Sequence, residues 1–306
     1  MRFERNNREG IHVNQATYWL QQILTGISVG GQYALIAIGY TMVYGILRLI
    51  NFAHGDIFMM AGFFMVYTTT WLPPAAAIPL VLIFTVALGV FIEKVAYKPL
   101  RTAPRMSVMI SAIGVSYFLQ NFATYFTGGL PQNYPTISFI SGSLTLGGIT
   151  LDKVTLITPV LTIVLVAALM QLINHTKIGM AMRAVSKDFE TSQLMGIKIN
   201  SVISMTFVIG SFLAGVGSML FFSKYSIVTP TVGAMPGLKA FVAAVFGGIG
   251  SIPGAVIGAF VIGICENIIK ALGQTTFSDA FTFVLLIVVL VVKPTGLFGA
   301  VEKEKV

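Results

Sequence analysis

Seven long stretches of this chain contain no Asp, Glu, Lys or Arg. A soluble domain cannot be built in this way, because it needs charged side chains on each exposed face. The hydrocarbon core of a bilayer is about 30 Å thick and takes roughly 20 apolar residues to cross as a helix. The uncharged stretches, some of them long enough for two crossings, are residues 10–47, 57–92, 106–151, 154–176, 199–223, 240–265 and 280–292. They predict a membrane protein with several crossings.

The composition points to helices rather than to a β-barrel. Only 10% of the 306 residues are charged, whereas soluble proteins have about 25%. The 31 glycines suit a bundle in which helix backbones approach each other closely. A barrel would show alternating segments of about ten residues, whereas these runs are continuously apolar. We therefore predict an all-α transmembrane helical bundle, with residues 1–306 forming a single domain.

The distribution of charge predicts which links lie in the cytoplasm. Basic residues gather near residues 94–105 and 177–198, whereas Lys153 is the only one in residues 128–153. Because cytoplasmic loops are enriched in Lys and Arg, we place the link at 175–200 inside and the link at 128–153 outside. Apolar and Ser/Thr residues alternate around glycines in the external link, which predicts a small hairpin. That hairpin is either a docking surface for an external partner or a packed lid.

Two of the eight hydrophobic segments are longer than one crossing requires. Residues 19–50 and 239–270 would each reach about 48 Å as unbroken helix at ~1.5 Å per residue. Their glycines suggest helix breaks beside a transport pathway, or else close helix packing. If both segments add a pass, the count becomes ten and both termini lie inside, which we favour because both are basic. The residues of these candidate breaks are Gly30, Gly31, Gly247, Gly248, Gly250, Pro253 and Gly254.

Three polar residues, Asn51, His54 and Asp56, follow the first uncharged stretch. An ionisable residue inside an apolar bundle is by default a candidate functional residue, so this group is a candidate lining of a translocation pathway. The same residues can instead turn the chain and cap the next helix. Both interpretations stay open. Further along the chain, Glu266 and Lys270 have the spacing of an intrahelical ion pair.

The cytoplasmic link contains a predicted short amphipathic helix. Ser186 is its candidate N-cap, and Asp188 and Glu190 occupy the first turn, where negative charge suits the helix dipole. Leu194 belongs to its apolar face, and Gly196 stands where a left-handed C-cap residue belongs. Such a helix can lie on lipid headgroups or dock into a groove on a partner protein.

Several segments carry a resemblance to a known family. They read YALIAIGYTMVYG at 33–45, NFAHGD at 51–56, AVFGGIGSIPGAVIG at 244–258 and VKPTGLFG at 292–299. In order and spacing they resemble the branched-chain amino acid ABC permease family, in particular the first of its two paralogous permeases. The segment from Glu190 to Gly196 resembles the EAA loop of ABC importers, with Thr191 and Ser192 in place of two alanines. Asp56 stands where the family often has Glu.

The resemblance implies a permease domain that forms half of a heterodimeric channel in the bacterial cytoplasmic (inner) membrane. The implied partners are a paralogous permease, two cytoplasmic ATPases that bind ATP and Mg, and an external substrate-binding protein. The chain has no Gly-Lys dipeptide and so no G-x-x-x-x-G-K-[ST] loop, which assigns ATP binding to the partner subunits. The residues implied in coupling to the ATPases are Ser186, Asp188, Glu190, Leu194 and Gly196.

Nothing in the sequence indicates an enzyme. The three histidines lie in different segments, and no metal-ligand spacing is present. We therefore expect a transport subunit without a cofactor of its own, which moves branched-chain or related neutral amino acids while its partners hydrolyse ATP. One alternative is a urea or short-amide permease of the same family. The other is an ATP-independent secondary transporter or channel, although the scarcity of intramembrane acids counts against proton coupling.

Overall fold

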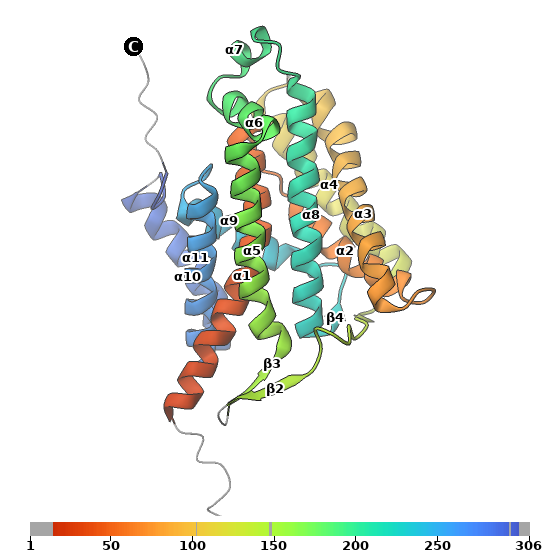
Figure 1. Cartoon of the computed structure of the whole chain (residues 1–306), viewed down its shortest axis with the longest axis vertical. Helices are drawn as coiled ribbons and strands as arrows, with labels where there is room; N and C mark the ends of the chain where they lie inside the picture. Colours follow the sequence, from red (N-terminus) through yellow and green to blue (C-terminus); the bar gives the residue numbers. More distant parts are fainter. Residues whose placement is uncertain (1–14, 102, 147–148, 294, 300–306) are drawn as a thin grey trace, which may run out of the picture.

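The computed structural model describes residues 15–101, 103–146, 149–293 and 295–299. Almost all regular structure in it is helical, and α5 and α8 run along the long axis of the molecule (Figure 1). The elements are α1 (Gln15–Leu47), α2 (His54–Thr68), α3 (Pro74–Ile92), η1 (Glu93–Tyr97), η2 (Lys98–Leu100), α4 (Arg105–Thr127), β1 (Gln132–Asn133), β2 (Ser143–Leu146), β3 (Ile149–Asp152), α5 (Lys153–His175), α6 (Lys177–Lys187), α7 (Phe189–Leu194), α8 (Ile199–Tyr225), β4 (Ile227–Val228), α9 (Ala234–Gly247), α10 (Ile252–Ala271) and α11 (Thr275–Val292).

Seven of the described helices are long and apolar enough to cross a membrane. They are α1, α3, α4, α5, α8, α10 and α11. Helices α2 and α9 have 15 and 14 residues, which is short for a full crossing of about 20. The prediction of a polytopic all-α bundle is confirmed, with two half-length helices in addition to the seven long ones.

Helix α1 forms the axis of the bundle and contacts α5, α8, α9 and α10. It is continuous through its glycines, so of the two interpretations left open for this segment the helix break is wrong and close packing holds. Gly30 faces α10 so closely that a Cβ there would lie 2.6 Å from the Cα of Phe260, and one at Gly26 would lie 2.8 Å from the Cα of Ile264. Gly31 faces Thr162 of α5. The glycines of α1 are therefore used for close packing, as in small-residue helix crossings.

The second long segment is broken as predicted. Helix α9 ends at Gly247, the backbone turns through Gly248 (φ +105°) and Gly250 (φ +96°), and α10 runs back against α9. Only glycine adopts these φ values without strain. A Cβ on Gly247 would lie 2.0 Å from the carbonyl oxygen of Gly254, which shows how tightly the two helices pack at the turn.

The two described ends of the chain lie at opposite ends of the bundle. Near the start of α1, the Tyr18 hydroxyl donates to the Ala271 carbonyl at the end of α10, and Gln21 donates to the Thr150 carbonyl. Helix α11 starts beside the end of α10 and runs to the end that carries α6 and α7 (Figure 1). The expectation that both termini share the cytoplasmic side is therefore wrong for the described ends. The reason is that α1 crosses the membrane only once. It lacks the helix break that would have added a second crossing.

The external link forms the predicted hairpin. Strands β2 and β3 pair antiparallel, with Ser143 opposite Asp152 and Leu144 opposite Leu151. A second short pair joins β1 to β4. Both pairs lie at the end of the bundle opposite α6 and α7 (Figure 1). Because the basic links lie at the α6 end, the positive-inside rule assigns that end to the cytoplasm and the hairpins to the outside.

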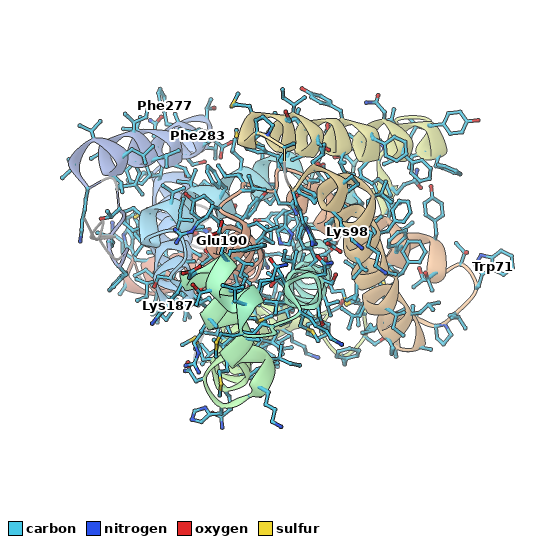
Figure 2. All side chains as sticks on the ribbon, turned by 90° about the horizontal axis from the view of Figure 1, so that it is seen from above. Trp71, Lys98, Lys187, Glu190, Phe277 and Phe283 are labelled. Atoms are coloured by element: carbon cyan, nitrogen blue, oxygen red, sulfur yellow. The ribbon has the colours of Figure 1, made fainter. Side chains whose placement is uncertain are left out.

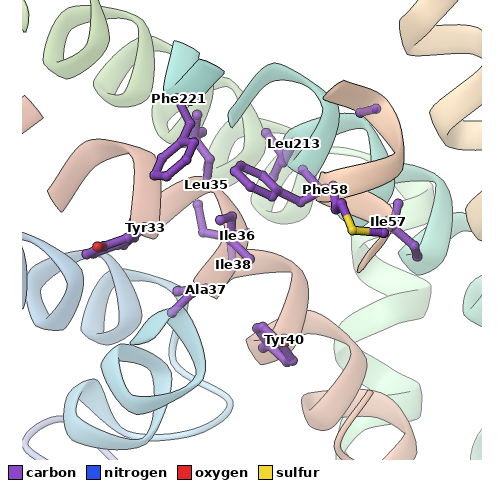
Figure 3. Packing of buried hydrophobic residues seen from close by; sticks show 14 of the residues in the cluster. Tyr33, Leu35, Ile36, Ala37, Ile38, Tyr40, Ile57, Phe58, Leu213 and Phe221 are labelled. Atoms are coloured by element: carbon purple, nitrogen blue, oxygen red, sulfur yellow. The ribbon is translucent and has the colours of Figure 1, made fainter. Parts of the chain in front are cut away.

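The core lies where α1 meets α2 and α8. Leu35, Ile36 and Ile38 of α1 and Phe58 of α2 are fully buried, with Phe221 of α8 beside them (Figure 3). The ring of Phe58 packs against that of Phe221 with centroids 5.4 Å apart. This packing holds α2 inside the bundle although it is too short to span it.

Candidate functional site

The two half-length helices begin against each other in the interior of the bundle. Gly55, in the first turn of α2, packs on Gly233 and Gly237 at the start of α9. A Cβ on Gly55 would lie 2.6 Å from the Gly233 carbonyl oxygen, and a Cβ on Gly237 would lie 2.9 Å from the Cα of Gly55. The positive ends of two helix dipoles therefore meet inside the protein, an arrangement found at substrate sites of transporters with discontinuous helices.

A cavity of about 320 Å³ adjoins this contact. It lies between α1, the start of α2, α4 and α9. Its lining combines polar groups with apolar side chains. The lining residues are Tyr40, Phe52, Gly55, Asp56, Ile113, Ser116, Tyr117, Gln120, Gly233, Ala234, Gly237, Leu238 and Phe241. A cavity of this kind, at the meeting point of broken helices, is the best candidate for a substrate pathway.

Asp56 is the charged residue of this cavity, and its side chain is held by α4. The residue is only 2% exposed. Its carboxylate accepts hydrogen bonds from the Ser116 hydroxyl and from Gln120 Nε2, the latter at 3.0 Å. The N-cap of α2 is Ala53, without a side-chain cap bond, so Asp56 does not act as the helix cap. The carboxylate is therefore aimed across to α4.

Asn51 and His54 are buried but do not line the cavity. Asn51 Oδ1 accepts a 2.6 Å hydrogen bond from the Tyr97 hydroxyl of η1, and its carbonyl accepts from the backbone of His54. The imidazole of His54 packs edge-on against Tyr40, with centroids 5.1 Å apart, and against Gly39. These two residues shape the turn that leads into α2, whereas Asp56 alone of the three faces the cavity. Their part in a pathway stays a prediction.

The predicted pathway glycines fall in two places, both away from this cavity. Gly30 and Gly31 lie in the α1 contacts with α10 and α5. The residues from Gly247 to Gly254 form the turn between α9 and α10, where Pro253 lies in the first turn of α10 and the Ser251 hydroxyl caps that helix. This turn lies near the cytoplasmic end, since Gly250 shares a small cleft with Ser186 of α6.

The cytoplasmic link consists of two helices, α6 and α7. Ser186 lies inside α6, where its hydroxyl bonds the Arg183 carbonyl, so the prediction that it caps the helix is wrong. The cap of α7 is Asp188, whose carboxylate accepts from the backbone and the hydroxyl of Thr191. These bonds hold the pKa of Asp188 below its usual value. Gly196 has the predicted left-handed conformation, with φ +82°.

Helix α7 projects from the cytoplasmic end of the bundle (Figure 1). Met182 and Val185 of α6 are buried against the bundle, whereas Leu194 and Met195 at the end of α7 are 87% and 78% exposed. Glu190 is also exposed on α7, and Figure 2 shows this part of the chain at the front when the molecule is seen from that end. The link therefore presents an apolar tip and a carboxylate to the cytoplasm.

The sequence analysis missed the residues that complete the cavity. Ser116 and Gln120 lie four residues apart on the face of α4 that meets Asp56, and Tyr40 comes from α1. The sequence did contain a signal for them, because polar residues four apart on an otherwise apolar helix form a polar stripe that faces the protein interior. The partner of that stripe lies 60 residues earlier in the chain and could not be read from spacing.

Of two buried ionic clusters, the sequence analysis missed one and predicted the other only in part. Glu93 of η1 pairs with Arg101 and accepts a 2.9 Å hydrogen bond from the Ser204 hydroxyl of α8. Glu266 of α10 pairs with Lys270, as predicted, but also with Lys239 of α9 at 2.8 Å. Both clusters tie together helices that are distant in sequence.

Comparisons with known proteins agree with this architecture. The family model described as "Branched-chain amino acid transport system / permease component" matches residues 22–290. The chain is 41% identical to the high-affinity branched-chain amino acid transport system permease protein LivH of Escherichia coli K12, over 95% of this chain and 99% of the relative. It is 41% identical to LivH of Salmonella typhimurium, with the same coverage. It is 39% identical to the corresponding protein BraD of Pseudomonas aeruginosa, over 94% of this chain and 98% of the relative. The chain, with its seven long apolar helices and two half-length ones, belongs to the branched-chain amino acid transport system permease family.

Proposed function

We propose that this chain is a permease subunit of an ABC importer that carries branched-chain amino acids across the cytoplasmic membrane. The observation that carries the proposal is the apolar tip of α7, formed by Leu194 and Met195, in a chain that belongs to this permease family. Leu194 and Met195 stand almost fully exposed at the cytoplasmic end. Outside the lipid, two adjacent exposed apolar side chains at the tip of a helix suit a docking contact with a partner protein. A short helix with such a tip fits a groove on a cytoplasmic partner, which here is the ATPase.

The mechanism that we propose is alternating access driven from the cytoplasmic side. Movement of the ATPases displaces α6 and α7. Helix α6 shares a cleft with the turn between α9 and α10, because Met182, Arg183 and Ser186 line it together with Gly250 and Ile252. Displacement of α6 therefore acts on the end of α9, and the other end of α9 forms a wall of the Asp56 cavity. Substrate arrives from an external binding protein at the hairpin end.

The coupling proposal predicts a large loss of transport when the α7 tip becomes charged. Leu194→Asp should lower ATP-driven leucine uptake about tenfold or more, because central apolar anchors of an interface contribute ~2 kcal/mol or more. The measurement is uptake of labelled leucine into proteoliposomes that contain the permease pair, the ATPases and the binding protein. Leu194→Met, which keeps the tip apolar, is the matched control and should keep most of the uptake. Equal uptake by both variants would contradict coupling through α7.

The same assay separates the alternative functions. Leucine uptake by this chain alone, independent of ATP, would favour a secondary transporter or a channel. An assembly that hydrolyses ATP in response to a binding protein but ignores leucine would favour a urea or amide permease. Uptake that requires the full set of partners is the result expected here.

We place the second permease against the face formed by α4 and α11. The two helices lie along the same edge of the bundle, as Figure 2 shows with Phe277 and Phe283 of α11 on it. The cavity between α4 and α9 is lined by the exposed side chains of Ile113 and Tyr117. Polar groups open to lipid are costly, so a protein partner is expected to cover this cavity.

This placement predicts the result of photo-crosslinking. A benzophenone side chain at Tyr117 should capture the second permease, because Tyr117 lies at the edge of the cavity and is exposed. The same group at Phe91 of α3, which is equally exposed on another face, should capture lipid only. The products are resolved by mass on a denaturing gel. Capture of the permease from Phe91 and not from Tyr117 would show that the partner lies elsewhere.

A further inference from the structure

We infer that Asp56 is the group that binds the ammonium of the amino acid during its passage through the permease. The inference rests on the proposed function and extends it, because it assigns a substrate subsite and its chemistry to residues of this chain. It is drawn from the charge balance of the buried carboxylates and from the shape and lining of the cavity that Asp56 faces.

Asp56 lacks the cationic partner that the other buried carboxylates have. Glu93 pairs with Arg101, and Glu266 pairs with Lys239 and Lys270. Among the residues that the structure describes, no Lys, Arg or His nitrogen lies within 4.0 Å of the Asp56 carboxylate. A carboxylate inside a membrane protein is costly unless a positive charge compensates it. Apart from the positive ends of α2 and α9, no cation of the described residues compensates this carboxylate, and a substrate ammonium in the cavity would supply that charge.

The carboxylate is held in one orientation, ready to accept a cation. The Ser116 hydroxyl bonds one oxygen, and Gln120 Nε2 bonds the other at 3.0 Å. Gln120 Nε2 also donates to Ser116 Oγ at 3.2 Å, so the two α4 side chains support each other. These donors are neutral, and a carboxylate has about four acceptor positions, so capacity remains for a charged donor from the cavity.

The rest of the cavity fits a branched aliphatic amino acid. Its volume of about 320 Å³ lies within the range of small-molecule sites. Phe52, Ile113, Leu238 and Phe241 supply apolar surface for an aliphatic side chain. The first turn of α9 also borders the cavity, and its positive dipole end favours the substrate carboxylate. Urea and simple amides carry no charge, so they would leave Asp56 uncompensated.

Transport measurements on charge-changed variants test the role of Asp56. Asp56→Asn keeps the shape but removes the charge; its Oδ1 can accept from Gln120 Nε2 while its amide NH₂ donates to the Ser116 hydroxyl. We expect ATP-driven leucine uptake by the full transporter to fall about tenfold or more, because hydrogen bonds to charged groups contribute roughly 1.5–3 kcal/mol. Basal ATP hydrolysis should stay within about twofold, which reports an intact assembly. Asp56→Glu should recover part of the uptake, since it restores the carboxylate.

A matched control and a ligand series complete the test. Asp279→Asn removes a carboxylate that bonds Lys239 and does not line the cavity, and it should leave uptake close to that of the unaltered transporter. Saturation-transfer NMR on the permease–ATPase assembly in nanodiscs compares L-leucine, 3-methylbutylamine and 4-methylpentanoate. We expect leucine and the amine to bind and the acid, which lacks the ammonium, to bind far more weakly. Asp56→Asn should abolish the binding of the amine.

The outcomes keep the two proposals apart. If the unaltered transporter imports leucine with ATP and Asp56→Asn does so equally well, the role of Asp56 is overturned and the proposed function stands. Binding of 4-methylpentanoate in preference to the amine would also overturn it. If the unaltered transporter does not import leucine at all, the proposed function fails, whatever the variants do.

Discussion

Replacing Glu266 by glutamine is expected to lower the free energy of unfolding by about 3–5 kcal/mol, the usual effect of breaking a buried ion pair by removing one partner. The Glu266 side chain is 1% exposed, and its Oε1 accepts from Lys239 Nζ at 2.8 Å and from Lys270 Nζ. Its Oε2 accepts from the Tyr33 hydroxyl of α1 at 3.0 Å. The neutral amide cannot compensate two lysines, and with its oxygen toward both lysines its NH₂ group would face the Tyr33 hydroxyl, which then has to accept instead of donate.

The measurement is the midpoint of thermal unfolding of the purified protein, together with the yield of folded protein from membranes. Asp279→Asn is the matched control. Asp279 bonds the same Lys239 amine at 2.6 Å, but its side chain is 45% exposed, so its loss should cost about 1 kcal/mol or less. Adding Lys239→Met to Glu266→Gln should recover part of the stability, because it removes the uncompensated charge. Equal midpoints for Glu266→Gln and Asp279→Asn would contradict this account.

The second large effect is expected at Gly30 of α1. A leucine there should destabilise the protein by about 1–3 kcal/mol or more, the typical cost of overpacking. The reason is that a Cβ on Gly30 would lie 2.6 Å from the Cα of Phe260 and 2.9 Å from the carbonyl oxygen of Ala259. Backbone atoms of α10 cannot rotate away as a side chain can, so α1 and α10 must separate.

Gly114 of α4 provides the comparison for Gly30. Both glycines lie within long membrane-crossing helices, but a Cβ on Gly114 would meet no other atom within 4 Å. Gly114→Leu should therefore leave the unfolding midpoint close to that of the unaltered protein. If Gly30 is instead a flexible break in the helix, as its sequence context also allowed, Gly30→Leu would reduce transport but leave stability unchanged. Such a result would mean that the α1–α10 packing described above is wrong.

The two long segments show why a glycine pattern alone does not determine the local structure. Both contain clustered glycines, yet α1 continues through Gly26, Gly30 and Gly31 while the other segment turns at Gly248 and Gly250. In lipid, a helix break leaves backbone groups without partners unless the protein supplies them. In the second segment the protein supplies such partners, because the backbone N–H groups of Leu297 and Phe298 donate to the carbonyls of Phe246 and Gly247.

The candidate site was only partly predictable for a similar reason. Asp56 was recognisable because an ionisable residue beside an apolar stretch is conspicuous by itself. Its partners Ser116 and Gln120 were not, since their relation to Asp56 depends on α4 packing beside α2. The ionic cluster around Glu266 was partly predictable for the same reason. The i, i+4 pair with Lys270 was readable from spacing, whereas Lys239 and Tyr33 reach Glu266 only through helix packing.

The sequence by itself determined the class of protein, its long apolar segments, the side that carries the basic links and the external hairpin. These properties follow residue by residue from the cost of placing charge in lipid and from local alternation, so each segment carries its own evidence. Only the tertiary structure decided which glycines pack and which turn the chain, and that α2 and α9 meet at Gly55 and Gly233. It also decided which buried charges are compensated within the chain. These properties depend on which helices touch, and the residues that bring them together stand far apart in the chain.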